Sequence, residues 1–112
     1  MTPSAAPGFA QSEEQFHAEA AGIAGCDDFG DASYLEGLRV LLRGYDEEAR
    51  FNEHGAAMAR QMVLGILVSR LQSQRQLREQ PEILEMPIER PLVICGLIRT
   101  GSTALHLSLI HI

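Results

Sequence analysis

The chain has 112 residues, of which 46% are hydrophobic and 21% are charged, and this composition excludes a disordered tail and a fibrous protein. A chain of this length provides one small domain or one piece of a larger one. The formal net charge is −6, which argues against a nucleic-acid duplex or an anionic membrane as the main partner. All nine basic residues are arginines, so the sequence offers no lysine for chemistry.

The first elements along the chain are a flexible lead-in and a helix. Residues 1–11 contain two prolines and several small residues, which is typical of a frayed terminus. A helical region is predicted over residues 12–90. Its first helix starts at Ser12, a suitable N-cap, and carries Glu13 and Glu14 in the first turn, where the helix dipole favours acidic residues. Gly25 is expected to end this helix.

Two further helices follow in the same region. Ser33 and Glu36 have the spacing of a capping box, which predicts the start of the second helix. Its apolar residues recur at helical spacing, at Leu35, Leu38, Leu42 and Tyr45. The third helix is predicted over residues 56–80, and Pro81 stops it. The main apolar face of this helix is expected to hold Met62, Val63, Ile66, Leu67 and Leu77.

Several polar or polarisable residues in the helical region are interpreted as parts of the core or the surface and not as a functional site. Met58 and Met62 are expected to lie in the core. His17 and His54 are interpreted as surface residues near helix starts. The acidic cluster is expected to form a solvated helix face, at Asp46, Glu47 and Glu48.

The cysteines and histidines do not predict a metal site. Cys26 and Cys95 are far apart, and neither has a second cysteine or a histidine at the close spacing that zinc ligands need. The N-terminus lacks a basic segment followed by an apolar run, and no apolar run approaches the ~20 residues that span a bilayer. We therefore expect a cytoplasmic protein without membrane insertion.

The sequence changes character at residue 91. The apolar run from Pro91 to Cys95 is β-branched in the middle and bounded by proline and glycine, which predicts a buried strand of a parallel sheet, with Cys95 as a small buried residue. A loop from Gly96 to Thr103 follows, and a helix is expected to begin at Ala104.

Strand, glycine-bounded loop and helix together are the geometry of a phosphate-binding loop. Gly96 and Gly101 are separated by four residues, as in a P-loop, although this spacing alone also occurs by chance. Glycine permits the backbone torsions that turn N–H groups inward, and the helix start adds unpaired donors. Ser102 and Thr103 supply hydroxyls, and Arg99 supplies a fixed positive charge. Because serine follows Gly101 where nucleotide triphosphatases have lysine, an ATPase or conventional kinase is disfavoured.

Residues 91–106 resemble the 5′-phosphosulfate loop of bacterial sulfotransferases that use 3′-phosphoadenosine-5′-phosphosulfate (PAPS). The matching residues are Arg90, Pro91, Gly96, Arg99, Thr100, Gly101, Ser102, Thr103, Leu105 and His106. The segment 27–31 and the helices before the loop also resemble the N-terminal region of that branch. Two residues depart from the family pattern, since Ile98 stands where proline is usual and Ser102 where threonine is usual.

The resemblance implies an α/β P-loop-containing fold for the parent protein, with this chain mostly α-helical and one strand leading into the loop. It implies that Arg99 is catalytic and stabilises charge on the sulfuryl group as it is transferred. It also implies that the cofactor is bound by Gly96, Arg99, Thr100, Gly101, Ser102 and Thr103. The reaction would move a sulfuryl group from PAPS to a hydroxyl or amine of a small-molecule acceptor, without a metal.

The C-terminal end suggests that the chain is an N-terminal fragment of such an enzyme. A βαβ unit takes roughly thirty residues or more, and only nine residues follow Thr103. On this hypothesis residues 91–106 are the first strand and loop of a truncated domain, and the fragment itself is inactive. Residues 107–112 match a translation of CTG TCT CTT ATA CAC ATC, the end of a transposase sequencing adaptor, and are interpreted as a read-through artefact.

Two other functions remain open at this point. The chain could belong to another P-loop enzyme, a nucleotide-dependent kinase of small molecules that uses Arg99 in place of lysine. It could also be a non-enzymatic helical interaction module, with Arg99 an ordinary surface charge and the glycine loop incidental. His106 could line the phosphate site or serve only in packing, and it is not assigned as the base. The sequence does not indicate the oligomeric state.

Overall fold

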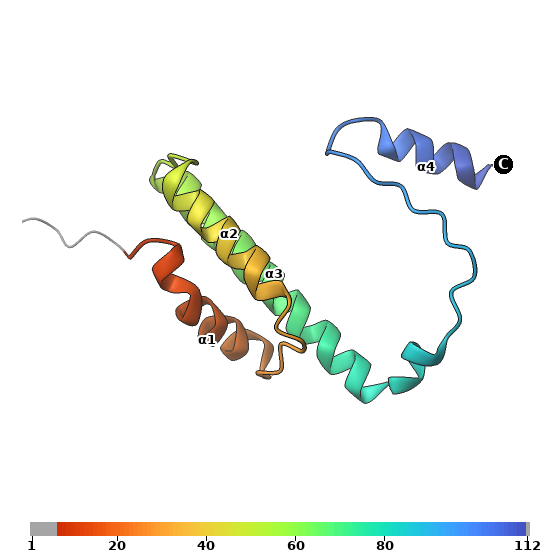
Figure 1. Cartoon of the computed structure of the whole chain (residues 1–112), viewed down its shortest axis with the longest axis horizontal. Helices are drawn as coiled ribbons and strands as arrows, with labels where there is room; N and C mark the ends of the chain where they lie inside the picture. The colour runs from red at the N-terminus through yellow and green to blue at the C-terminus, as the bar shows by residue number, and fades with distance from the viewer. Residues whose placement is uncertain (1–6, 112) are drawn as a thin grey trace, which may run out of the picture.

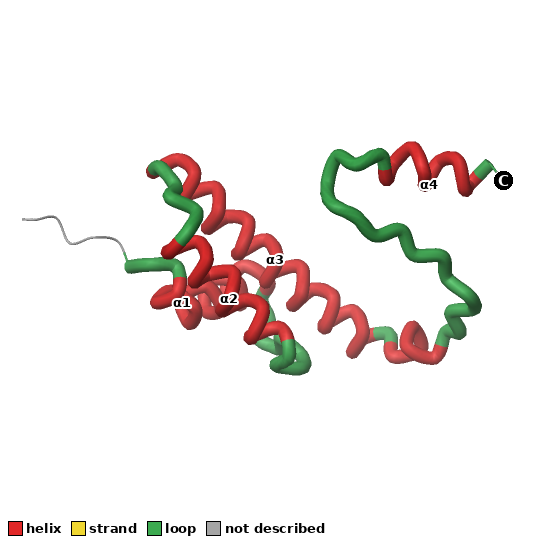
Figure 2. The backbone as a smooth tube through the Cα atoms, turned by 45° about the horizontal axis from the view of Figure 1, so that its top comes forward, coloured by secondary structure: helices red, strands yellow, loops and turns green. Residues whose placement is uncertain are grey.

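A computed structural model describes residues 7–111 and shows a helical protein (Figures 1 and 2). The described residues contain no strand. The elements in chain order are η1 (Ala10–Ser12), α1 (Glu13–Ala24), α2 (Tyr34–Glu47), α3 (Glu53–Glu79), η2 (Pro81–Glu85) and α4 (Ser102–Ile110). The helical character expected from the sequence is therefore confirmed.

Helix α1 begins and ends where the sequence predicts, although Ser12 does not cap it with its side chain. The Ser12 hydroxyl donates to the carbonyl oxygen of Gly8 at 2.8 Å and is buried. Gly25 ends the helix in the left-handed conformation (φ 71°), which glycine adopts without a steric penalty. Its N–H donates to the carbonyl of Ala21, so one of the last helical acceptors is satisfied.

The chain before α1 packs on the helices from Phe9 onward, which differs from the flexible lead-in expected for residues 1–11. Phe9 is 6% exposed and contacts the rings of Phe16 and Tyr45. The carboxylate of Asp46 accepts hydrogen bonds from the N–H groups of Phe9 (2.8 Å) and Ala10 (2.9 Å). Asp46 thus anchors this turn, a role the solvated-face interpretation missed. Residues 1–6 of the lead-in lie outside the described residues.

Helix α3 is the central helix of the core. The buried residues that α1 and α2 contribute include Phe16, Ala20 and Leu42, and those of α3 are Ala59, Val63, Leu64, Leu67 and Leu71. Helix α1 lies close against α3, and the buried residues of the two helices include the small side chains Ala20 and Ala59. Helix α2 faces α3 through longer side chains and leaves an apolar hollow of about 290 Å³ between them.

The expected apolar face of α3 is wrong in part. Val63 and Leu67 are buried as predicted, but Met62 and Ile66 are 60% and 58% exposed. Leu64, which is not among the residues expected on this face, is buried. Met58 is also exposed, so the core interpretation of the two methionines is corrected. The reason is that helices α1 and α2 cover a face of α3 centred on Val63 and Leu67, which leaves Met58, Met62 and Ile66 uncovered.

A hydrogen bond within the loop and hydrogen bonds from arginines of α3 hold the loop between α1 and α2. Asp31 accepts the N–H of Ser33 at 2.8 Å, in place of the expected capping box. Hydrogen bonds from the Ser33 hydroxyl and N–H hold the pKa of Asp31 below its ordinary value. Arg70 of α3 donates to the carbonyl oxygens of Phe29 (2.6 Å) and Asp31 (2.9 Å). Arg75 donates to the carbonyl of Ala24 at 3.3 Å.

The strand expected at residues 91–95 is absent, and this part of the prediction is wrong. Residues 91–97 form no helix or strand, and Leu92 and Val93 are 75% and 72% exposed. A strand is stable only when a neighbouring strand pairs with its backbone, and the described residues offer no such neighbour. Cys95 is exposed for the same reason and not buried as expected. This extended segment carries α4 away from the three-helix core (Figure 1).

Candidate functional site

A tight turn precedes α4 and positions the predicted loop residues. Two residues on either side of Thr100 shape it, since Arg99 (φ 61°) and Gly101 (φ 88°) both have left-handed backbone conformations. The hydroxyl of Thr100 donates to the carbonyl oxygen of Leu97 at 2.6 Å and closes the turn. Gly96 lies close beneath it, because a Cβ at Gly96 would be 3.3 Å from the Thr100 hydroxyl oxygen.

The first turn of α4 presents free backbone donors beside this turn. The first hydrogen bond of the helix joins the N–H of Leu105 to the carbonyl of Gly101 at 3.1 Å. The N–H groups of Ser102, Thr103 and Ala104 precede this bond and have no acceptor within the helix. The helix dipole adds partial positive charge at the same end. The geometry suits an anion, and the hydroxyls of Ser102 and Thr103 add two more donors.

Most of the predicted site residues line one hollow. Its volume is about 420 Å³, and its lining consists of Arg99, Gly101, Ser102, Thr103, Ala104 and Leu107. Gly96 and Thr100 are not in this lining. The Thr100 hydroxyl proton is already used within the turn, so the N–H is the donor that Thr100 would offer to a ligand. The helix begins at Ser102, two residues earlier than expected.

A second hollow adjoins the first and shares two lining residues with it. It measures about 280 Å³ and is lined by Ile94, Ser102, Thr103 and His106. Ser102 and Thr103 therefore border both hollows, of which the first also contains Arg99 and the second contains His106. The residues of the site are solvent-exposed, and Ile98, which replaces the usual proline, is 91% exposed.

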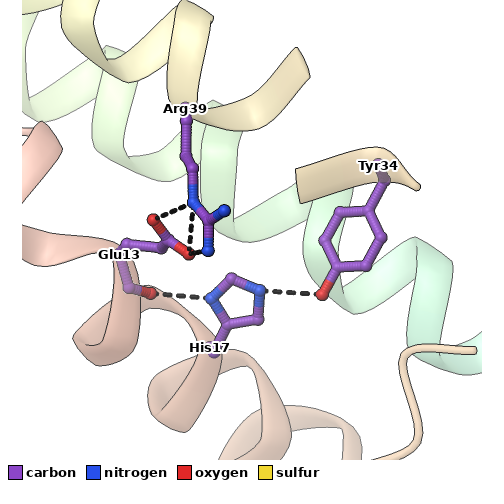
Figure 3. Close-up of polar contacts among 4 residues, drawn as sticks. All are labelled: Glu13, His17, Tyr34 and Arg39. Atoms are coloured by element: carbon purple, nitrogen blue, oxygen red, sulfur yellow. Dashed lines mark hydrogen bonds and ion pairs between the residues drawn. The ribbon is translucent and has the colours of Figure 1, made fainter. Parts of the chain in front are cut away.

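A separate polar cluster joins α1 to α2 (Figure 3). Arg39 donates to both carboxylate oxygens of Glu13, at 2.9 Å in each case. This hydrogen bonding lowers the pKa of Glu13 and raises that of Arg39. Next to this pair, His17 bridges Glu13 and Tyr34 with one ring nitrogen on each side.

The hydrogen bonds of His17 indicate where its ring carries a proton. A carbonyl oxygen only accepts, so Nδ1 carries the proton and donates to the Glu13 carbonyl at 2.7 Å. The other ring nitrogen, Nε2, forms a hydrogen bond with the Tyr34 hydroxyl at 2.8 Å. Burial raises the pKa of Tyr34 and keeps this hydroxyl protonated. The ring of His17 also lies against Phe29, so His17 joins the helices and is not the surface residue expected.

The sequence interpretation missed three residues that organise the helical part, namely His17, Asp46 and Arg70. Each makes its contact with a segment at least 17 residues away, and local periodicity carries no signal of such pairs. Phe9 is different, because it precedes Phe16 by about two helical turns and this spacing was available as a signal.

The described residues contain no group of three His, Cys, Asp or Glu side chains placed to hold a metal ion. The Cys26 thiol donates to the carbonyl of Leu71 at 3.9 Å. No helix in the described part of the chain is both long and apolar enough to cross a membrane.

Comparison with family models, with curated proteins and with solved structures found no match to this chain.

Proposed function

We propose that the chain is the N-terminal part of a PAPS-dependent sulfotransferase and that residues 96–103 bind the 5′-phosphosulfate of the cofactor. The observation that carries this proposal is the hollow shared by Arg99, Gly101, Ser102 and Thr103 at the start of α4. These are the residues on which the resemblance to sulfotransferases depends.

Each residue has a role that its chemistry supports. The N–H groups and hydroxyls of Ser102 and Thr103 bind the 5′-phosphate oxygens. Arg99 lines the same hollow and offers several donors and a permanent charge. It stabilises the negative charge that grows on the bridging oxygen as the bond from that oxygen to sulfur breaks.

The transfer itself forms a new bond between sulfur and an acceptor oxygen or nitrogen. The leaving group is 3′-phosphoadenosine-5′-phosphate, and the acceptor proton passes to a base from another part of the enzyme. The acceptor is a small molecule with a hydroxyl or amine, no metal takes part, and the compartment is cytoplasmic.

The test is a calorimetric titration of the protein from the complete reading frame with 3′-phosphoadenosine-5′-phosphate. Arg99→Ala is expected to weaken binding by roughly ten- to a hundredfold, the value of a hydrogen bond to a charged group. Arg43→Ala is the matched control, because it removes an exposed arginine from α2 with the same change in net charge. Undetectable binding by the native protein, or equal binding by Arg99→Ala, contradicts the proposal.

Competition with ATP and magnesium separates the sulfotransferase from a P-loop kinase. A sulfotransferase binds 3′-phosphoadenosine-5′-phosphate more tightly than MgATP, because its loop lacks the lysine that reaches the terminal phosphates. The opposite order of affinities supports the kinase.

One observation favours a second function, that of a helical interaction module. Met58, Met62 and Ile66 of α3 are more than half exposed, as is Val40 of α2. Exposed apolar residues of this size are typical of a surface that packs on another body. Under this alternative, Gly101→Val leaves the activity of the protein unchanged, whereas the sulfotransferase loses cofactor binding because valine does not tolerate the φ of 88°.

A further inference from the structure

We infer that His106 is a second side-chain donor, besides Arg99, to the anion held at the start of α4. This inference rests on the proposed function and adds a residue to its cofactor site. It comes from the two adjoining hollows, one containing Arg99 and the other containing His106, which share Ser102 and Thr103.

The position of His106 in the helix supports this role. It follows Ser102 by four residues and Thr103 by three, so all three lie on neighbouring parts of one helical face. Helical side chains lean toward the N-terminus of their helix, so a side chain in the second turn covers the first turn. The imidazole of His106 therefore leans toward the hydroxyls of Ser102 and Thr103 and not away from them.

The chemistry of imidazole suits an anion at this place. A neutral histidine has one N–H donor and a protonated one has two, so His106 can donate in either state. Ile94 forms the other wall of this hollow and provides no competing acceptor from its side chain. An anion on the first turn of α4 would then receive side-chain donors from Arg99 and His106 and backbone donors from the helix end.

The test compares the affinity of 3′-phosphoadenosine-5′-phosphate for variants of the protein from the complete reading frame. His106→Leu is expected to weaken binding by roughly three- to tenfold, as expected for the loss of one hydrogen bond at an exposed site. His106→Gln, which keeps an N–H donor, is expected to recover part of the affinity. His54→Leu is the matched control, since His54 is an exposed histidine on α3, far from the loop in the sequence.

The imidazole resonances of His106 provide a direct second readout. They are expected to shift when the ligand is added, whereas those of His54 stay in place. Circular dichroism verifies that each variant retains its helices.

The outcomes separate this inference from the proposed function. If Arg99→Ala weakens binding and His106→Leu binds like the native protein, the role of His106 is refuted and the sulfotransferase proposal stands. If the native protein binds no 3′-phosphoadenosine-5′-phosphate, both are refuted. Weakened binding in His106→Leu, partial recovery in His106→Gln and an unchanged His54→Leu variant support the inference.

Discussion

At the scale of single residues, the ion pair between Glu13 and Arg39 links the first turn of α1 to α2. The hydrogen bond from Arg39 lowers the pKa of Glu13 below its ordinary value of 4.5. A carboxylate with a lowered pKa stabilises the fold above its unfolded-state pKa, and this contribution is lost as the pH falls through the folded-state pKa. The stability of the helical part therefore depends on pH in the acidic range.

Glu13→Gln tests this dependence. The variant is expected to unfold at a slightly lower temperature than the native protein at pH 7, because the pair is exposed to solvent and screened. The difference is expected to shrink below pH 4.5 and to vanish once Glu13 is protonated in the native protein. Thermal unfolding followed by circular dichroism from pH 2.5 to 7 measures it. A difference that stays constant across this range contradicts the assignment.

The neighbouring residues Leu67 and Ile66 allow a matched test of which face of α3 is buried in the core. Leu67 is 1% exposed and Ile66 is 58% exposed. Leu67→Ala is expected to cost about 2–5 kcal/mol of unfolding free energy, because it leaves a cavity among α1, α2 and α3. Ile66→Ala is expected to change the stability by only about 0.5 kcal/mol. Urea unfolding of both variants gives the comparison, and equal effects would mean that the core is placed on the wrong face of α3.

At the scale of elements, the positions of the helices were predictable and their partners were not. The bounds of α1 and the end of α3 before Pro81 follow from local signals such as Glu13, Gly25 and the proline itself. The buried face of α3 depends on where α1 and α2 lie, which periodicity alone does not specify. The prediction of a strand at residues 91–95 was wrong because a strand needs a partner strand from elsewhere in the chain, which the local residue pattern does not reveal.

Arg70 is expected to be the most important residue of the contact between α3 and the loop at 26–33. It donates to two carbonyl groups and lies over the ring of Tyr34 at 4.2 Å. Arg70→Met is expected to cost about 1–2 kcal/mol, because the partly buried carbonyl of Phe29 loses its donor. Amide hydrogen exchange in the loop is expected to accelerate in this variant.

Arg78→Met is the control for that experiment. Arg78 pairs with Asp28 in the same loop, but its side chain is 73% exposed. An exposed ion pair contributes little, so the variant is expected to lose less stability than Arg70→Met. A larger loss in Arg78→Met would show that the ion pair, and not the carbonyl contacts, holds the loop.

The candidate site, like the helices, was predictable only in part from the sequence. The glycine spacing and Arg99 identified the turn, and Arg99, Gly101, Ser102 and Thr103 border one hollow as a phosphate site requires. The hydrogen bond from the Thr100 hydroxyl to the carbonyl oxygen of Leu97 was not predictable, because it forms within a turn in which Arg99 has a left-handed conformation. Whether the loop binds PAPS stays a prediction.

At the scale of the whole molecule, the chain is extended. Its radius of gyration is 18.3 Å, whereas a compact chain of this length has about 13 Å. The segment that leads to α4 accounts for the shape, since it leaves the core after η2 (Figure 2). Leu97 and Ile98 in this segment are exposed. The three-helix part and the loop–helix part are therefore expected to behave differently in solution.

Hydrogen exchange and small-angle scattering test this difference. The amides of residues 91–97 are expected to exchange nearly as fast as in an unfolded chain, because they belong to no helix or strand. Those of Val63, Leu67 and Leu71 are expected to be protected to the level of global unfolding. Scattering is expected to give a radius of gyration near 18.3 Å. A value near that of a compact chain, or strong protection of residues 91–97, contradicts the extended arrangement.

The manner in which α3 holds the loop after α1 has a consequence for protein engineering. Arg70 binds main-chain oxygens of the loop, and Arg75 binds the main-chain oxygen of Ala24 at the end of α1. Every amino acid possesses such an oxygen, so these contacts do not depend on an exposed loop side chain such as that of Asp27. The exposed Asp27 is therefore a suitable attachment point for a fluorescent or spin label that reports on the helices without perturbing them.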